Sequence, residues 1–211
     1  GQIDLERAEK ATDVGAACGD APGDVALNRA RLRAWLPSEP HWLDQVHGTE
    51  VVDASTAHSL HLRVDGLSPS RWYWYRFATA GARSEPARTR TAPAPDREEP
   101  FSFAIASCQR FDDGHYAAWR HLADESPDLV VFLGDYIYES APRKGRVRTH
   151  VGQGAAATLA DYRARYEQYR SDPALRRIHA SAPWILTWDD HEVQNDYAAD
   201  RGQDLASDFL A

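Results

Sequence analysis

Three apolar runs in the second half of the chain, each followed at once by polar residues, most constrain what this sequence can fold into. The clearest is the continuous run Leu129–Leu133, which leads into Gly134 and Asp135. A run of that length without a polar interruption is typical of a parallel strand that is buried on both faces. Apolar segments at 101–105 and 183–188 predict one strand before it and one after it.

Helical patterns separate these predicted strands. Apolar and aromatic residues at 116–123 recur at helical spacing, which favours a parallel strand pair with a crossover helix. A longer helix is predicted from Thr158 to Arg170, opened by a capping box, and Pro173 begins another. We therefore expect an α/β layer over roughly residues 100–211.

The start of the chain has a different character. Residues 1–55 are expected to be helical or mixed, with Asp24 placed to cap a helix. Leu27, Leu32 and Trp35 would then supply one apolar helix face.

The next segment has the pattern of short strands. Residues 58–91 predict a β-hairpin, in which the alternating residues 60–64 pair with 72–77 across a Gly-Leu-Ser-Pro turn. The proline-rich, charged segment 92–100 favours extended backbone and marks a domain boundary.

Composition excludes some classes of function. The net charge is −8, with 24 basic against 32 acidic residues, so no nucleic-acid-binding surface is evident. The apolar runs are too short to cross a membrane, and no membrane partner is expected. Cys18 and Cys108 are too few for a disulfide framework. An acidic chain does, however, suit divalent cations.

Each predicted strand of the second half runs into residues able to bind a metal or transfer a proton. The first strand leads to Cys108, the second to residues 135–139, and the third to residues 189–192. Because the carboxyl ends of parallel strands converge on one crevice, the three loops are expected to meet. A group of thiolate, carboxylates, phenolate and imidazole suits one cation beside a second, and such a pair can clamp a phosphoryl group.

Each of these residues also has an ordinary structural interpretation. A single cysteine at a strand end is often a small buried apolar residue. A Gly-Asp pair often forms a turn, and acidic residues at the start of a helix interact favourably with the helix dipole. The joint placement of all three groups after successive strands favours a site.

Four phrases, in this order, resemble the alkaline phosphatase D family. They are Ala-Ser-Cys-Gln at 106–109, Pro-Asp-Leu-Val-Val-Phe-Leu-Gly-Asp-Tyr-Ile-Tyr-Glu at 127–139, Tyr-Arg-Ser-Asp-Pro-Ala-Leu-Arg at 169–176 and Trp-Asp-Asp-His-Glu-Val-Gln-Asn-Asp at 188–196. The resemblance implies that residues 96–211 are the N-terminal half of a catalytic domain, a partial calcineurin-like metallophosphoesterase layer.

The resemblance also implies a set of ligands. Cys108, Asp135 and Tyr138 would bind iron (Fe³⁺), with Asp135 bridging to a second ion, often calcium in this family. Asp190 and Asn195 are the candidates for the second ion. Another divalent metal is an alternative.

His191 would lie near the scissile phosphate and assist the transition state or the leaving group. The implied activity is hydrolysis of phosphate monoesters or diesters, with a phosphate ester as substrate. Family members are commonly exported, which implies a secreted or periplasmic location, although no signal peptide opens this sequence.

The first half combines two further resemblances. Residues 56–95 resemble the end of the immunoglobulin- or fibronectin-like domain that precedes the catalytic domain of that family, here a β-hairpin remnant. Residues 1–55 resemble the laccase-domain proteins, also called polyphenol oxidoreductase-like or purine nucleoside phosphorylase-like, in which the counterpart of His47 is one of three ligands to zinc or copper. The other two ligands are not in this sequence, and the junction is expected near residues 54–58.

Two alternatives to a phosphoesterase follow. Because the family's downstream metal ligands are absent, the chain could be a truncated or chimeric fragment without catalysis, which self-associates through an open sheet edge. Alternatively, His47 could support laccase-like or nucleoside-cleaving chemistry. A His47 variant would then lose that activity, while a Cys108 variant would not.

Overall fold

The computed structural model describes residues 3–5, 29–35, 46–51, 57, 59, 61–78 and 82–198. The chain divides into two compact units, residues 1–100 and 101–211. None of the described helices has the length and apolar character needed to cross a bilayer. Most of the segment that resembles a laccase domain, including the predicted cap Asp24, lies outside the described residues.

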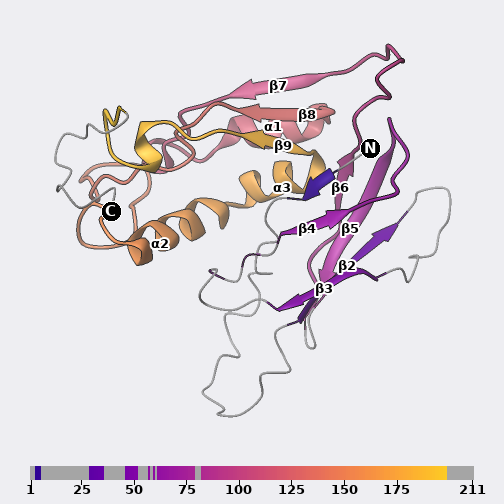
Figure 1. Ribbon diagram of the computed structural model, residues 1–211. Helices are drawn as coiled ribbons and strands as arrows, with labels where there is room; N and C mark the ends of the chain where they lie inside the picture. Colours follow the sequence, from indigo (N-terminus) through magenta and orange to yellow (C-terminus); the bar gives the residue numbers. More distant parts are fainter. Residues whose placement is uncertain are drawn as a thin grey trace, which may run out of the picture. The chain divides into compact units, whose positions relative to one another are not determined.

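The first unit contains antiparallel sheets (Figure 1). A four-stranded sheet has the order β3-β2-β5-β6, and β1 pairs separately with β4. In β2 every second residue from Arg29 to Arg33 is arginine, which is the period of a strand. The strands are β1 (Ile3–Leu5), β2 (Arg29–Trp35), β3 (Val46–Val51), β4 (Leu62–Val64), β5 (Trp72–Ala78) and β6 (Ala87–Arg90).

Two expectations for this unit are wrong. The residues around Leu32, expected to form a helix face, form β2, because it is hydrogen-bonded to β3 on one edge and to β5 on the other. β4 and β5 are strands but do not pair with each other, since β4 takes a distant partner, β1. The hairpin of this region joins β5 to β6, with Tyr73 opposite Thr89.

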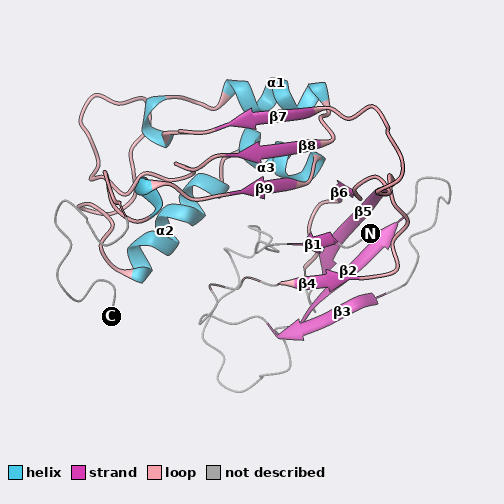
Figure 2. Ribbon diagram, turned by 45° about the horizontal axis from the view of Figure 1, so that its top comes forward, coloured by secondary structure: helices cyan, strands magenta, loops and turns pink. Residues whose placement is uncertain are grey.

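The second unit is built on a three-stranded parallel sheet in the order β7-β8-β9 (Figure 2). The register places Phe103 beside Leu129 and Val130 beside Trp184. The predicted α/β arrangement with a parallel sheet is confirmed. Its elements are β7 (Phe103–Ala106), a 3-10 turn (Phe111–Asp113), α1 (Ala117–Glu125), β8 (Leu129–Phe132), α2 (Leu159–Arg170), α3 (Pro173–Ser181), β9 (Trp184–Leu186) and a second 3-10 turn (Asp190–Glu192).

The helices α1 and α3 lie on one face of this sheet (Figure 2). Strand order follows chain order, and crossovers between parallel strands are right-handed, so both connections deliver their helices to the same side. Val130 and Phe132 are fully buried there, in one cluster with Trp119 of α1 and Ile178 of α3. This cluster is the core of the unit.

The opposite face of the sheet carries exposed apolar side chains. Phe103, Ile105 and Ile185 are each more than half exposed, and Leu133 is 50% exposed. The predicted burial of the β8 run on both faces is therefore wrong. The cause is the one-sided placement of α1 and α3, which leaves that face uncovered by the described part of this unit.

Local capping begins both later helices as predicted. The Thr158 hydroxyl accepts the Asp161 N–H at 3.2 Å, and the Asp161 carboxylate accepts the Thr158 N–H at 2.9 Å. Pro173 occupies the first turn of α3, whose N-cap, Asp172, accepts two backbone N–H groups. These caps fix where α2 and α3 start after the loop that follows β8.

Candidate metal centre

The loops after β7, β8 and β9 meet at the carboxyl edge of the parallel sheet. The Cys108 N–H donates to the Gly134 carbonyl at 3.2 Å, and the Gln109 N–H donates to the Asp135 carbonyl at 3.1 Å. The third loop reaches the second through Glu192, whose carboxylate accepts the Asp135 N–H at 3.1 Å. The predicted convergence of the three loops is confirmed.

Gly134 is required where the second and third loops cross. Its φ is +99°, and a Cβ at this position would lie 2.5 Å from the Asp189 Cβ and 2.7 Å from the Asp189 nitrogen. Cys108 and Asp135 also have positive φ values, of 58° and 56°. Non-glycine residues in this region cost conformational energy and cluster at functional sites.

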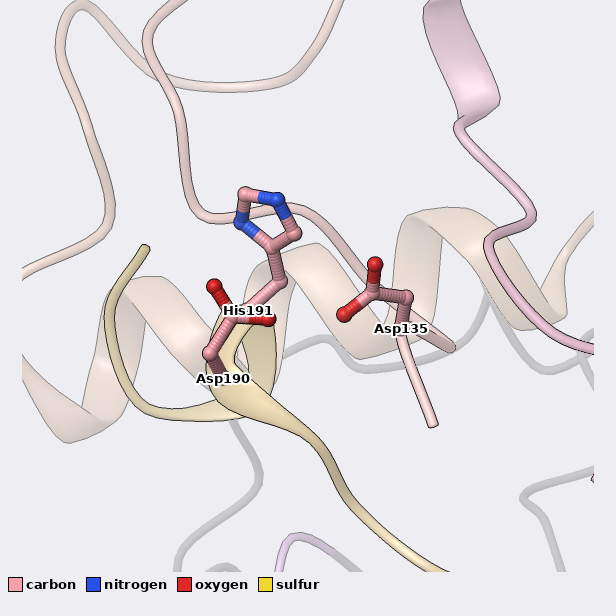
Figure 3. A group of neighbouring side chains, drawn as sticks. All are labelled: Asp135, Asp190 and His191. Atoms are coloured by element: carbon pink, nitrogen blue, oxygen red, sulfur yellow. The ribbon is translucent and has the colours of Figure 1, made fainter. Parts of the chain in front are cut away.

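Asp135, Asp190 and His191 form the centre of the site (Figure 3). One potential ligand atom from each lies within 4.8 Å of the others. Figure 3 shows the carboxylates of Asp135 and Asp190 turned toward each other, with the imidazole of His191 beside them. The Asp135 Oδ1 atom is buried without a hydrogen-bond partner. A buried carboxylate oxygen in this state suits a cation, which would supply the missing partner.

Tyr138 and Cys108 lie against this centre. The Tyr138 hydroxyl donates to Asp135 Oδ2 at 2.9 Å. Burial, this hydrogen bond and the nearby charges of Asp135 and Cys108 raise the pKa of Tyr138 above its usual value. The phenol is thus held protonated by its protein surroundings, and only added positive charge would favour the phenolate. Cys108 is a free, exposed cysteine.

Asn195 is hydrogen-bonded within the loops of the site. Its side-chain amide donates to Asp196 at 2.8 Å, and its backbone N–H donates to Glu139 Oε1 at 3.0 Å. Of the six residues predicted for the site, Asp135, Asp190 and His191 form the cluster and Tyr138 and Cys108 lie beside it, while Asn195 bonds to Glu139, the partner of His191.

Glu139 is a residue of the site for which the sequence predicted no role. Its Oε2 lies 2.8 Å from His191 Nδ1, while its Oε1 accepts the Asn195 N–H. Glu139 is 7% exposed, so this carboxylate acts on the imidazole with little competition from water. Glu139 is the last residue of the run Asp-Tyr-Ile-Tyr-Glu that follows β8. The sequence feature that could have identified it was an acidic residue after β8 together with a histidine after β9.

Glu192 has a structural part in the site. Its carboxylate accepts backbone N–H groups from Asp135, Tyr136 and Asp189, which belong to two different loops. With its oxygens engaged in this way, Glu192 joins the β8 and β9 loops. It therefore holds the backbone of Asp135 close to that of Asp189, the residue before Asp190.

The fold and the site define a class. The second unit is a parallel α/β layer with oxygen and nitrogen donors converging at the carboxyl edge, the arrangement expected of a protein that binds a cation and an anionic ligand there. Residues 103–208 match the family described as PhoD-like phosphatase, and residues 31–93 match the N-terminal domain described for PhoD-like phosphatases. The chain belongs to the PhoD-like phosphatase family, as the sequence phrases predicted.

Individual relatives agree. The chain is 48% identical over 172 residues to alkaline phosphatase D of Bacillus subtilis, which covers 77% of this chain and 29% of the relative. A solved structure titled "Structure of PhoD" superposes with a TM-score of 0.75 at 42% identity, covering 87% of this chain and 36% of that chain. The chain thus spans about a third of the length of these relatives.

A second, shorter similarity is also present. The chain is 55% identical over 42 residues to the purine nucleoside phosphorylase YfiH of Escherichia coli, which covers 19% of this chain and 17% of the relative. His47, the residue on which the alternative chemistry depends, lies in β3, and its side chain is outside the described residues. Chemistry at His47 therefore stays a prediction.

Proposed function

We propose that this chain carries a metal-dependent phosphoesterase site that hydrolyses phosphate monoesters or diesters. The observation that carries the proposal is the convergence of Asp135, Asp190 and His191 at the sheet edge, with Asp135 Oδ1 buried and unpartnered. Membership of the PhoD-like phosphatase family supports a phosphoric ester as the substrate.

The residues present fit a pair of cations. Cys108, Tyr138 and Asp135 offer thiolate, phenolate and carboxylate donors, which suit iron, while Asp190 and Asn195 offer harder oxygen donors, which suit calcium. Bound cations would withdraw charge from the phosphoryl oxygens and favour the attack of water on phosphorus at neutral pH.

His191 is proposed to donate a proton to the leaving group. Glu139 Oε2 lies 2.8 Å from His191 Nδ1, where a carboxylate can accept the Nδ1 proton, and Nε2 is then the ring nitrogen available to the substrate. As the water oxygen bonds to phosphorus and the P–O ester bond breaks, a protonated Nε2 would donate its proton to the departing alkoxide oxygen. The attacking water would release a proton to solvent, and His191 would take up a proton from solvent before the next turnover. Glu139 holds the ring in the orientation that this transfer needs.

The test is hydrolysis of 4-nitrophenyl phosphate and bis(4-nitrophenyl) phosphate by the full chain. It is run with added iron and calcium and then with a chelator. Phenyl phosphate and diphenyl phosphate are assayed beside the 4-nitrophenyl esters, because phenolate is a poorer leaving group than 4-nitrophenolate and depends more on a proton donor. We expect chelator-sensitive turnover of all these esters, and a fall in His191→Ala of about 100-fold or more with the phenyl esters, larger than with the 4-nitrophenyl esters. His121→Ala is the matched control, because His121 is an exposed residue of α1. Turnover unchanged in a double variant, Asp135→Ala with His191→Ala, would exclude the proposed site.

A further inference from the structure

Two buried polar side chains of α2 hydrogen-bond to the loop that follows β8. Arg165 and Tyr169 are one helical turn apart, on the same face of α2, and are 2% and 0% exposed. A buried guanidinium loses its hydration, so its placement is costly unless the protein supplies acceptors. The acceptors that Arg165 uses identify its role.

The partners of Arg165 are mainly backbone carbonyls of the loop that follows β8. Its Nη1 donates to the carbonyl oxygens of Tyr138 and Ser140, the latter at 3.1 Å, and its Nη2 donates to the Val151 carbonyl at 3.2 Å. Nη1 also lies 3.1 Å from His150 Nδ1. No carboxylate pairs with Arg165 within the described part of the chain.

The two carbonyls held by Nη1 flank Glu139. Fixing the backbone on both sides of a residue fixes the direction in which its side chain leaves the main chain. From this segment the Tyr138 hydroxyl reaches Asp135 at 2.9 Å, and the Glu139 carboxylate reaches His191 at 2.8 Å. Arg165 therefore contacts the backbone that carries two side chains of the site, without contacting Asp135 or His191 through any hydrogen bond in the described part of the chain.

The guanidinium of Arg165 is only partly satisfied by hydrogen bonds. The Arg165 Nε atom is buried without a partner, which carries a desolvation cost. Removing the guanidinium would leave the carbonyls of residues 138, 140 and 151 without this donor. Two of these three carbonyls flank Glu139, so the bonds of Arg165 are concentrated on the segment that carries Tyr138 and Glu139.

We propose that Arg165 is a positioning residue, which holds the backbone at residues 138–140 so that Tyr138 and Glu139 meet Asp135 and His191 in the geometry of the metal site. The proposal rests on the proposed function for its catalytic consequence. Its structural part, the ordering of residues 138–140 by Arg165, can be measured without any metal.

The experiment compares amide hydrogen exchange of the metal-free full chain with its Arg165→Met variant. We expect exchange in the segment that contains residues 136–142 to accelerate by about tenfold or more, with much less change in β8. Arg177→Met is the matched control, because Arg177 is an exposed arginine of α3 whose hydrogen bond goes to Asp124 of α1, outside this segment. Arg165→Lys, which retains a charged donor, should lie between wild type and Arg165→Met.

Calcium titration by calorimetry supplies the second readout. Affinity should fall by about 10- to 100-fold in Arg165→Met, the range for residues that orient metal ligands, with partial recovery in Arg165→Lys and no loss in Arg177→Met. Wild-type exchange and affinity in Arg165→Met would overturn the proposal and leave the proposed function intact. If wild type binds no calcium, that result counts against the proposed function, and the exchange result alone tests the positioning role of Arg165. If Arg165→Met does not fold, Arg165→Lys decides by the same criterion.

Discussion

Two acidic centres in the second unit differ in how their charges are compensated. Asp112 is fully buried and lies between two arginines, 3.1 Å from Arg110 Nε and 2.8 Å from Arg143 Nε. Asp135 is 7% exposed and Asp190 lies beside it, yet neither forms an ion pair with a lysine or arginine in the described part of the chain. Arginine side chains therefore balance the charge of Asp112, whereas no lysine or arginine in the described part of the chain balances Asp135 or Asp190.

The difference separates a structural acid from acids that await a ligand. Burial acts to raise the pKa of Asp112, but the Arg143 hydrogen bond and the charges of His150, Arg110 and Arg143 outweigh it and lower that pKa to about 2. Asp135 has a tyrosine hydroxyl on one oxygen and no partner on the other. Because no lysine or arginine among the described residues balances the charge of Asp135, a bound cation could form that ion pair instead.

The largest effect should come from breaking the compensated centre. Asp112→Ala leaves Arg110 and Arg143 without their shared carboxylate, and we expect a loss of about 3 kcal/mol in the free energy of unfolding of this unit. Urea denaturation followed by circular dichroism measures it. A loss below about 1 kcal/mol would mean that water stabilises the two guanidinium groups about as well as the Asp112 carboxylate does.

Acid should remove the same contribution reversibly. The pKa of Asp112 is lowered from 3.8 to about 2, so the unfolded state binds more protons between these values. The stabilisation is complete above about pH 4 and is lost as the pH falls toward 2, by about 2 kcal/mol in total. Denaturation at a series of pH values should give a shallower slope for Asp112→Asn than for wild type in this window.

Neutralising the uncompensated centre should cost much less. In Asp135→Asn the amide oxygen can still accept the Tyr138 hydroxyl, and asparagine tolerates the positive φ at this position. We expect the stability of the metal-free chain to change by less than about 1 kcal/mol, or to rise. A thermal melt of chelator-treated protein checks this. A large destabilisation would show that Asp135 supports the fold after all.

An exposed pair should matter least. Arg146 lies 2.9 Å from Asp113, and their side chains are 40% and 46% exposed. Arg146→Ala should therefore change stability by at most about 0.5 kcal/mol, since water screens such pairs. If its effect in a urea titration equalled that of Asp112→Ala, burial would not be what distinguishes the two acids.

Local signals in the sequence predicted much of the fold. The capping box at Thr158 and the apolar run of β8 depend on neighbours in the chain, and both were read correctly as the start of a helix and as a strand. Strand β2 was missed because its pairing with β3 and β5 is not local. One-sided burial of β8 depends on where the helices pack, which a strand's own residues do not record.

The site was predicted in part for a similar reason. Asp135, Asp190 and His191 follow successive strands, so strand order was enough to bring them together. The hydrogen bond from Glu139 to His191 and the buried guanidinium of Arg165 depend on side-chain directions set by packing. Neither leaves a spacing pattern in the sequence.

The most direct test of the account is a titration of the chelator-treated full chain with iron and calcium, by calorimetry and elemental analysis, beside Asp135→Asn and the control Asp113→Asn. The account predicts that wild type and Asp113→Asn bind cations, whereas Asp135→Asn loses at least about tenfold in affinity, because Asp135 supplies the unpartnered oxygen. Equal binding by all three proteins, or none by wild type, would contradict a metal centre at the edge of this sheet.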